Sequence, residues 1–167
     1  MERKCKVLVV GAGPGGYVAA IRAGQLGLNT IIIEGDRAGG TCLIRGCIPS
    51  KAVIHAASRF EELGAHAGAG EMGISLPDGP LLNMGALVAW KESIVDKLNS
   101  GVETLLKKAG VELLQGWATF HDGKTCDVKT ADGSVTITAE HVILATGSLA
   151  TELPFMPFGG NIISSTE

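Results

Sequence analysis

Short apolar runs alternate with a helical pattern through the first third of the chain. Residues 4–10 form an apolar run that ends at glycine, which is typical of a buried parallel strand. Alanine and leucine then recur with helical spacing over residues 14–26, and residues 30–34 form a second, β-branched run. These segments predict a strand–helix–strand unit of about 30 residues, the size that a parallel crossover requires.

Two helical patterns follow in the middle of the chain. Residues 50–63 predict a helix that Pro49 can open, because a proline in the first turn loses no helical hydrogen bond. Residues 84–109 give the clearest pattern, with Gly110 at the position of a C-terminal cap. The apolar stripe of this helix is expected to pack in the core, and it consists of Leu87, Trp90, Ile94, Leu98, Val102 and Leu105. Residues 64–82 are rich in glycine and predict a loop.

The last third of the chain predicts strands. Residues 111–114 and 141–145 are short apolar runs, and a three-stranded antiparallel meander is expected between them. Asp-Gly pairs mark the turns of this meander, whose strands are predicted at 117–121, 125–130 and 134–138.

Composition places the chain among ordinary globular domains. Its 167 residues suit one domain, and 46% are hydrophobic while 19% are charged, which excludes a disordered chain. The formal net charge of −3 gives no reason to propose nucleic acid or a membrane as a partner, and the apolar runs are too short to span a bilayer. No signal-peptide pattern follows the charged start, so we expect a cytoplasmic protein.

A glycine-rich loop follows the first predicted strand. Its sequence, Gly-Ala-Gly-Pro-Gly-Gly, matches the dinucleotide fingerprint in the strand–turn–helix context that the mechanism needs. Gly11 permits the tight turn, Gly13 lets a pyrophosphate approach the backbone, and Gly16 lets the helix pack closely on the strand. Pro14 and Gly15 lie at the start of that helix, where free N–H groups favour negative charge.

An acidic residue supports this interpretation of the glycines. Glu34 lies about 20 residues further on, at the end of the second strand, where its carboxylate can accept hydrogen bonds from ribose hydroxyls. Residues 68–73 have the same glycine spacing, but they follow a predicted helix and are assigned to a loop. The fold class is therefore α/β, a Rossmann-like three-layer fold of the FAD/NAD(P)-binding type with a parallel sheet and a small antiparallel meander.

Two of the four cysteines, Cys42 and Cys47, lie close together in the sequence. In an ideal helix their Cα atoms would be roughly 8.6 Å apart, beyond the roughly 7 Å that a disulfide allows. The segment must therefore be distorted if the two are bonded, and Gly46 makes such a distortion less costly. Cys5 and Cys126 fall in predicted strands and are expected to be packing or surface residues.

Three interpretations of the close cysteine pair are open. A zinc site would need two more thiolates or imidazoles at short spacing, and because the sequence has none nearby, no metal site is predicted. Two inert buried thiols would carry no chemistry. A redox pair would take up two electrons by thiol–disulfide exchange, and Arg45 and Lys51 would favour the thiolate form. The residues favour this third interpretation.

The segment from Gly39 to Lys51, together with the glycine fingerprint, resembles the flavoprotein disulfide reductases. Its ending, Cys-Ile-Pro-Ser-Lys at 47–51, is most similar to the dihydrolipoamide dehydrogenase branch of that family. The sequence Ala-Thr-Gly at 145–147 looks like the second FAD-contact motif of the family. The resemblance covers essentially the whole chain.

The resemblance implies a role for each of these positions. Cys42 would meet dihydrolipoamide as the interchange thiol, Cys47 would face the flavin as the charge-transfer thiol, and Lys51 would contact the flavin. The implied FAD-binding residues are Gly11, Gly13, Pro14, Gly15, Gly16, Glu34, Gly35, Gly40, Thr41, Cys42, Lys51, Ala118, Thr146, Gly147 and Ser148.

The resemblance also implies an activity and partners for the intact enzyme. It would oxidise dihydrolipoamide carried by the acyltransferase subunit of a 2-oxo-acid dehydrogenase complex, and it would pass hydride through FAD to NAD. Such an enzyme is expected to be a homodimer. One local departure from the family stands beside the first redox cysteine, where Ile44 and Arg45 replace an asparagine and a small apolar residue.

A larger departure is length. Residues 1–148 are expected to form the FAD-binding domain, and residues 149–167 a linker toward an NAD-binding domain that these 167 residues lack. The general base of the family lies in a further domain, so we expect the chain alone to be inactive and to bind FAD weakly or not at all. The alternative is a stand-alone FAD- or dinucleotide-binding module whose cysteine pair senses redox state.

Overall fold

The computed structural model describes residues 2–65, 76–164 and 166 of the chain. The described residues form four helices and six strands, in the order β1 (Glu2–Val10), α1 (Pro14–Gln25), β2 (Thr30–Glu34), α2 (Gly40–Ile44), α3 (Cys47–Ala65), α4 (Met84–Lys108), β3 (Glu112–Gln115), β4 (Trp117–Phe120), β5 (Thr125–Thr130) and β6 (Gly133–Leu144). The second glycine-rich stretch at 68–73 lies outside the described residues. None of the helices that the structure describes is both long and apolar enough to cross a lipid bilayer.

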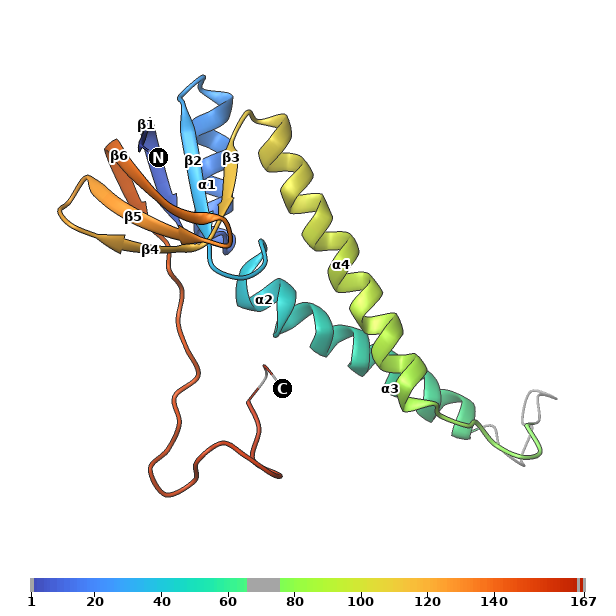
Figure 1. Cartoon of the computed structure of the whole chain (residues 1–167). Coiled ribbons are helices and arrows are strands. Elements are labelled where there is room, and N and C mark those ends of the chain that lie inside the picture. The colour runs from blue at the N-terminus through green and yellow to red at the C-terminus, as the bar shows by residue number, and fades with distance from the viewer. Residues whose placement is uncertain (1, 66–75, 165, 167) are drawn as a thin grey trace.

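The strands form a single sheet in the order β3-β2-β1-β6-β5-β4 (Figure 1). β3, β2, β1 and β6 are parallel, whereas β5 and β4 are antiparallel to their neighbours. The chain moves outward from β1 to β2 and β3 on one side, and β6 lies on the other side of β1. In open α/β sheets a reversal of strand order of this kind marks the crevice where ligands bind. The predicted α/β class is confirmed.

Strand β6 belongs both to the antiparallel meander and to the parallel part of the sheet. β6 runs unbroken to Leu144. Its first half pairs with β5. On its other side it pairs with β1, from Glu2 opposite Thr136 to Val10 opposite Leu144. The prediction of two separate strands at 134–138 and 141–145 was wrong. β1 supplies hydrogen-bonding partners on both sides of residues 139–140, so the strand continues where the pattern suggested a gap.

Side chains of β1 feed two separate clusters on the two faces of the sheet. Val7 and Val9 pack in a cluster with residues of α1 and α4, such as Ala20 and Leu106. Leu8 packs on the other face, in a cluster that includes Cys5, Ile31, Ile33, Cys126, Val128 and Ile137. Helices α1 and α4 thus pack on one face of the parallel strands. On the other face, residues of β5 and β6 pack against residues of β1 and β2, so the antiparallel end of this one sheet curls over its parallel part.

Helices α3 and α4 pack against each other and extend together away from the sheet (Figure 1). The Asn83 side chain accepts a hydrogen bond from the Ala86 N–H at 3.0 Å and caps the start of α4. Gly110 follows the helix with φ of 73°, as expected for a glycine just after a helix end. The two ends of α4 have different neighbours, since one lies beside α3 and the other contacts α1 and β3.

The apolar stripe predicted for α4 was largely wrong. The buried residues of the helix are Val95, Asn99, Val102 and Leu106. Of the predicted stripe only Val102 is among them, while Trp90, Leu98 and Leu105 are between 41% and 52% exposed. The buried residues recur at intervals of three and four, so they also form one stripe, displaced by about one residue from the predicted stripe. The polar Asn99 within it concealed this face from the sequence pattern.

Candidate functional site

The glycine loop joins β1 to α1 at the carboxyl ends of the parallel strands. Gly11 has φ of 97°, and a Cβ atom there would lie 2.2 Å from the carbonyl oxygen of Ala145. A Cβ on Gly16 would lie 1.7 Å from the carbonyl oxygen of Gly11. Glycine at position 16 therefore lets α1 begin close to the end of β1, and glycine at position 11 lets the loop pass close to the residues after β6.

Gly13 lacks a side chain for a different reason. A Cβ at this position would meet only the Cα atom of Gly40, at an ordinary contact distance of 3.7 Å. The space beside Gly13 is therefore not filled by the protein. Gly40, in contrast, has φ of 69°, and its own Cβ would lie 2.6 Å from the Gly13 Cα atom. The start of α2 thus rests directly on the backbone of the glycine loop.

The Glu34 carboxylate points back toward the glycine loop. Its Oε2 atom accepts a hydrogen bond from the Ala12 N–H at 2.7 Å, and its Oε1 atom accepts one from the Asp36 N–H at 2.9 Å. An ionised carboxylate has roughly four acceptor positions, so acceptor capacity remains for hydroxyl groups of a ligand. The structure adds a second task for this residue, which is to fix the glycine loop.

A cavity of about 710 Å³ opens at the carboxyl ends of the parallel strands. Its volume falls within the range of about 300–1,000 Å³ that is typical of small-molecule sites. The predicted site residues that line it are Gly11, Gly13, Pro14, Gly15, Glu34, Gly35, Gly40, Thr41, Cys42, Ala118, Thr146, Gly147 and Ser148. The cavity thus brings together segments from the two ends of the described chain, while Gly16, Cys47 and Lys51 do not line it.

The residues of the cavity suit a dinucleotide such as FAD. α1 begins at Pro14 in the cavity wall, and its cap residue is Gly13, so no side chain covers the free N–H groups of its first turn. Such a helix start favours a pyrophosphate group. The open space beside Gly13 and the remaining acceptor capacity of Glu34 fit the phosphate and ribose of the same ligand.

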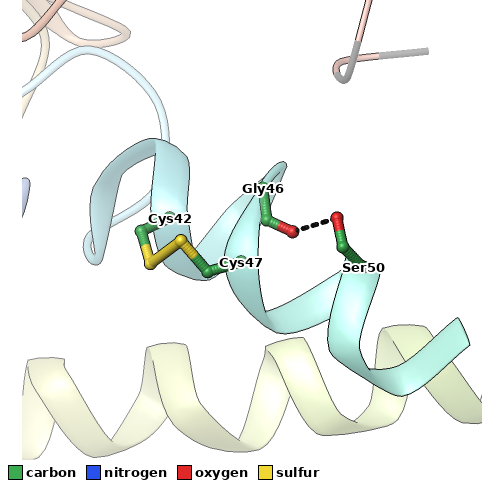
Figure 2. The surroundings of a disulfide bond; sticks show 4 residues. All are labelled: Cys42, Gly46, Cys47 and Ser50. Atoms are coloured by element: carbon green, nitrogen blue, oxygen red, sulfur yellow. Dashed lines mark hydrogen bonds between the residues drawn. A yellow bond between two sulfur atoms is a disulfide. The ribbon is translucent and has the colours of Figure 1, made fainter. Parts of the chain in front are cut away.

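The disulfide between Cys42 and Cys47 spans a break between α2 and α3 (Figure 2). The two Cα atoms are 4.6 Å apart, far closer than an ideal helix would allow. α2 is a helix that the sequence did not predict, and it ends just before Arg45. A Cβ on Gly46 would lie 3.1 Å from the Thr41 carbonyl oxygen, so glycine suits the tight bend. The predicted distortion of this segment is present.

α3 begins at Cys47, three residues earlier than predicted. Ser50 closes its first turn, because both its N–H, at 3.0 Å, and its hydroxyl, at 2.6 Å, donate to the Gly46 carbonyl oxygen (Figure 2). Pro49 lies within this first turn, where its missing N–H has no cost. The bend and the helix start together hold the second cysteine beside the first.

The two bonded cysteines have different surroundings. Cys42 is half-buried and lines the cavity, whereas Cys47 is exposed and does not. The resemblance implies instead that Cys47 faces the flavin and that Cys42 meets the substrate. Lys51 lies one turn further along α3 and is exposed. The roles of these three residues stay predictions.

The charge of Arg45 is balanced by a neighbour. Its guanidinium forms an ion pair with the Asp36 carboxylate, and both residues line the cavity. Arg37, also in the cavity wall, pairs with Asp96 of α4 at 2.6 Å. The expected influence of Arg45 on the cysteine thiolate is therefore offset by the Asp36 carboxylate beside it.

Trp117 is a residue of the cavity wall that the sequence analysis missed. A Cβ on Gly35 would lie 2.6 Å from the Trp117 ring, so the glycine leaves room for the indole beside the turn after β2. The side chain is 73% exposed and lines the cavity. Its position just after the carboxyl end of β3 is the signal that could have identified it, because cavities of this fold form there.

Cys5 and Cys126 are both buried and free. Burial raises the pKa of the Cys5 thiol to about 11, and burial also raises the pKa of the Cys126 thiol. Their predicted role as packing residues is confirmed. Within the described part of the chain, no group of three histidine, cysteine or acidic side chains could hold a metal ion.

Comparisons with known proteins agree with this geometry. Residues 5–164 match the family described as pyridine nucleotide-disulphide oxidoreductase. The dihydrolipoyl dehydrogenase of Pseudomonas aeruginosa is 53% identical, over 98% of this chain and 35% of that protein. The dihydrolipoyl dehydrogenase of Geobacillus stearothermophilus is 47% identical, over 96% of this chain and 33% of that protein. The chain therefore spans about a third of the length of these curated relatives.

A solved structure shows the same fold. The HOCl-induced flavoprotein disulfide reductase RclA from Escherichia coli, described as a Cu(II) complex, superposes with a TM-score of 0.75. The match covers 91% of this chain and 30% of that protein at 21% sequence identity. At this identity the likeness concerns the fold alone.

Proposed function

Because the chain belongs to the pyridine nucleotide-disulphide oxidoreductase family, we propose that it is the FAD-binding and dithiol-bearing portion of a dihydrolipoyl dehydrogenase. One observation carries this proposal. Cys42 belongs both to the disulfide and to the wall of the cavity that the glycine fingerprint lines. A redox disulfide at the edge of a dinucleotide cavity is the arrangement needed to pass electrons between a thiol substrate and a flavin.

The proposed reaction oxidises dihydrolipoamide and reduces NAD. One substrate thiolate attacks the Cys42 sulfur, which forms a mixed disulfide and releases Cys47 as a thiolate. The second substrate thiolate then attacks the substrate sulfur of the mixed disulfide, which closes the lipoamide ring and releases Cys42. Two electrons now reside in the cysteine pair, and the two thiol protons pass to bases or solvent. Bound FAD supplies the two-electron acceptor that passes them to NAD as hydride.

The residues of the chain would bind and orient this cofactor. The N–H groups of the glycine loop and of α1 would hold the pyrophosphate, and Glu34 would bind the ribose. Backbone near Ala118 would contact the adenine, and Lys51 would contact the flavin. The segment from Thr146 to Ser148 would close over the cofactor.

We further propose that residues 1–148 are the FAD-binding domain and that residues 149–167 lead to an NAD-binding domain. In support, β6 ends at Leu144, and the described part of the following segment shows two isolated bridges, Leu153 to Met156 and Gly159 to Ile162. The NAD site and the general base would come from the longer protein. That protein would act in the cytoplasm, as a homodimer, on the lipoyl group of an acyltransferase in a 2-oxo-acid dehydrogenase complex.

The cysteine roles are tested by single substitutions in the longer protein encoded by the gene, purified with bound FAD. With Cys42→Ser, a remaining Cys47 thiolate against the flavin is expected to give a long-wavelength charge-transfer band. With Cys47→Ser the band is expected to be absent. A band in Cys47→Ser but not in Cys42→Ser would reverse the two roles. The position of Cys42 in the cavity wall would favour that reversed assignment. No band in either variant would contradict the placement of the disulfide beside the flavin.

The activity is tested by comparing this chain with the longer protein encoded by its gene. The longer protein is expected to form NADH from dihydrolipoamide and NAD, and the 167-residue chain is expected to form none. The alternative is a stand-alone dinucleotide-binding module with a redox-sensing cysteine pair. It would be favoured if the gene encoded no second glycine fingerprint and the chain alone held stoichiometric FAD.

A further inference from the structure

The segment between β2 and α2, residues 35–39, links the cavity to the disulfide. Three of its residues bond to three different parts of the fold. The Asp36 carbonyl oxygen accepts a hydrogen bond from the Gln115 side chain, and the Gly39 N–H donates to the Ala12 carbonyl oxygen at 2.8 Å. The Ala38 carbonyl oxygen accepts a hydrogen bond from the Asn99 side chain at 2.6 Å.

Asn99 is the unusual member of this set. Only 9% exposed, it lies on the buried face of α4 among the apolar residues Val95, Val102 and Leu106. A buried amide is costly unless it is hydrogen-bonded, and the bond to Ala38 satisfies one of its donors. Ala38 is itself 1% exposed, so water cannot replace the bond on either side. The proposed reaction gives Asn99 no direct part.

The bond acts close to the disulfide along the chain. Ala38 lies two residues before Gly40, whose backbone rests on Gly13, and four residues before Cys42. Leu43 of α2 packs against the same cluster that contains Ala38, Val102 and Leu106. α4 therefore holds the segment before α2 by a hydrogen bond and α2 itself by apolar contact.

We propose that Asn99 is a positioning residue that holds the disulfide-bearing bend against the cofactor cavity. The inference rests on the proposed function, because the position of the bend matters only if the disulfide exchanges electrons with a ligand of that cavity. A second link supports it, since Arg37 of the same segment pairs with Asp96, one turn before Asn99 on α4. Removing the Asn99 amide frees residues 35–39 and lets Gly40 move away from Gly13. The effective concentration of the Cys42 thiol at the Cys47 thiol then falls.

The test compares Asn99→Ala with Val95→Ala. Val95 is fully buried on the same face of α4, so its truncation weakens packing without removing a hydrogen bond to residues 35–39. Each variant is equilibrated with mixtures of reduced and oxidised glutathione, and alkylation with mass spectrometry gives the ratio of disulfide to dithiol. Asn99→Ala is expected to lower this ratio about fivefold, the equivalent of one net hydrogen bond, whereas Val95→Ala leaves it unchanged.

An acidic substitution separates positioning from folding. Asn99→Asp cannot donate a hydrogen bond while ionised but can donate one when protonated, so its ratio is expected to approach that of the wild type as the pH falls. This variant also provides the test if Asn99→Ala does not fold. Equal ratios in Asn99→Ala and Val95→Ala, or a constant deficit in Asn99→Asp at every pH, would overturn the inference alone. A wild-type pair that glutathione neither oxidises nor reduces would overturn the proposed function as well.

Discussion

The chain places two pairs of cysteines in opposite kinds of environment. Cys42 and Cys47 lie five residues apart at a helix break, are bonded to each other, and are at least partly exposed. Cys5 and Cys126 lie in β1 and β5, are buried, and are free. The first pair faces a cavity and solvent, whereas the second fills the core between the sheet and the meander.

Backbone geometry explains the difference between the two pairs. The bend at Gly46 brings two sulfur atoms together that a regular helix would keep apart. In the sheet, β6 separates β1 from β5, and Cys5 and Cys126 on these two strands pack in the same core cluster as free thiols. Burial also keeps both core thiols protonated. The ability of two cysteines to form a disulfide therefore depends on local backbone shape and access, and the presence of cysteine is not sufficient.

The largest expected difference between the pairs is in reactivity. A thiol-specific disulfide reagent added to the folded, prereduced chain is expected to modify Cys42 and Cys47 quickly. Cys5 and Cys126 should react on the order of 1,000-fold more slowly, because modification of a core thiol requires local unfolding. Peptide mapping after timed quenching measures all four rates. Comparable rates in the folded state would remove the contrast, and equal rates in denaturant serve as the control.

Glycine substitutions test how tightly the backbone is packed around the cavity. Gly40→Ala combines a left-handed backbone conformation with a Cβ 2.6 Å from Gly13, so a loss of about 2 to 4 kcal/mol of stability is expected. Gly27→Ala is the matched control, since Gly27 has φ of 75° but open space around it. Urea unfolding of the chain measures the stability of each variant, and flavin fluorescence of the longer protein with the same substitution measures its FAD affinity. Only Gly40→Ala should weaken FAD binding, and equal losses of affinity would contradict the direct contact.

In the core around Cys126, the free energy of unfolding should be sensitive to the polarity of the side chain. Cys126→Ser places a hydroxyl in an apolar cluster, and a loss of about 1 to 3 kcal/mol is expected if the hydroxyl finds no partner. Cys126→Ala, which introduces no polar group, is the matched control and should cost less. Neither variant should change the glutathione ratio of the Cys42–Cys47 pair. A change in that ratio would show that the two regions are coupled.

The smallest expected effect is a pH dependence of stability. The Cys5 pKa is 9.0 in an unfolded chain and about 11 in the fold, so folding disfavours the thiolate. The stabilising contribution is complete below pH 9.0 and is lost as the pH rises through about 11. By about pH 10 the loss should reach about 1 kcal/mol. Urea unfolding across this range should show a flatter alkaline limb for Cys5→Ala, and an unchanged slope would contradict the burial of the Cys5 thiol.

The sequence alone determined the features that depend on neighbouring residues. The glycine fingerprint and Glu34 identified the cavity, because tight turns and strand ends are determined by residues that are adjacent in the sequence. The spacing of Cys42 and Cys47 required a distorted helix if the two were bonded, and the structure has both the disulfide and the distortion. The strand–helix–strand start was also correct, since each element has its own periodicity.

Only the tertiary structure decided the choice of distant partners. Sequence patterns indicated that α4 is amphipathic, but the positions of α3 and α1 decide which of its sides is buried, and they bury Asn99 in place of Leu98. The pairing of β6 with two strands, the contact of Trp117 with Gly35 and the bond from Asn99 to Ala38 likewise join residues far apart in the chain. Local periodicity does not predict such contacts, because they stabilise the protein only once the packed layers bring the two partners together.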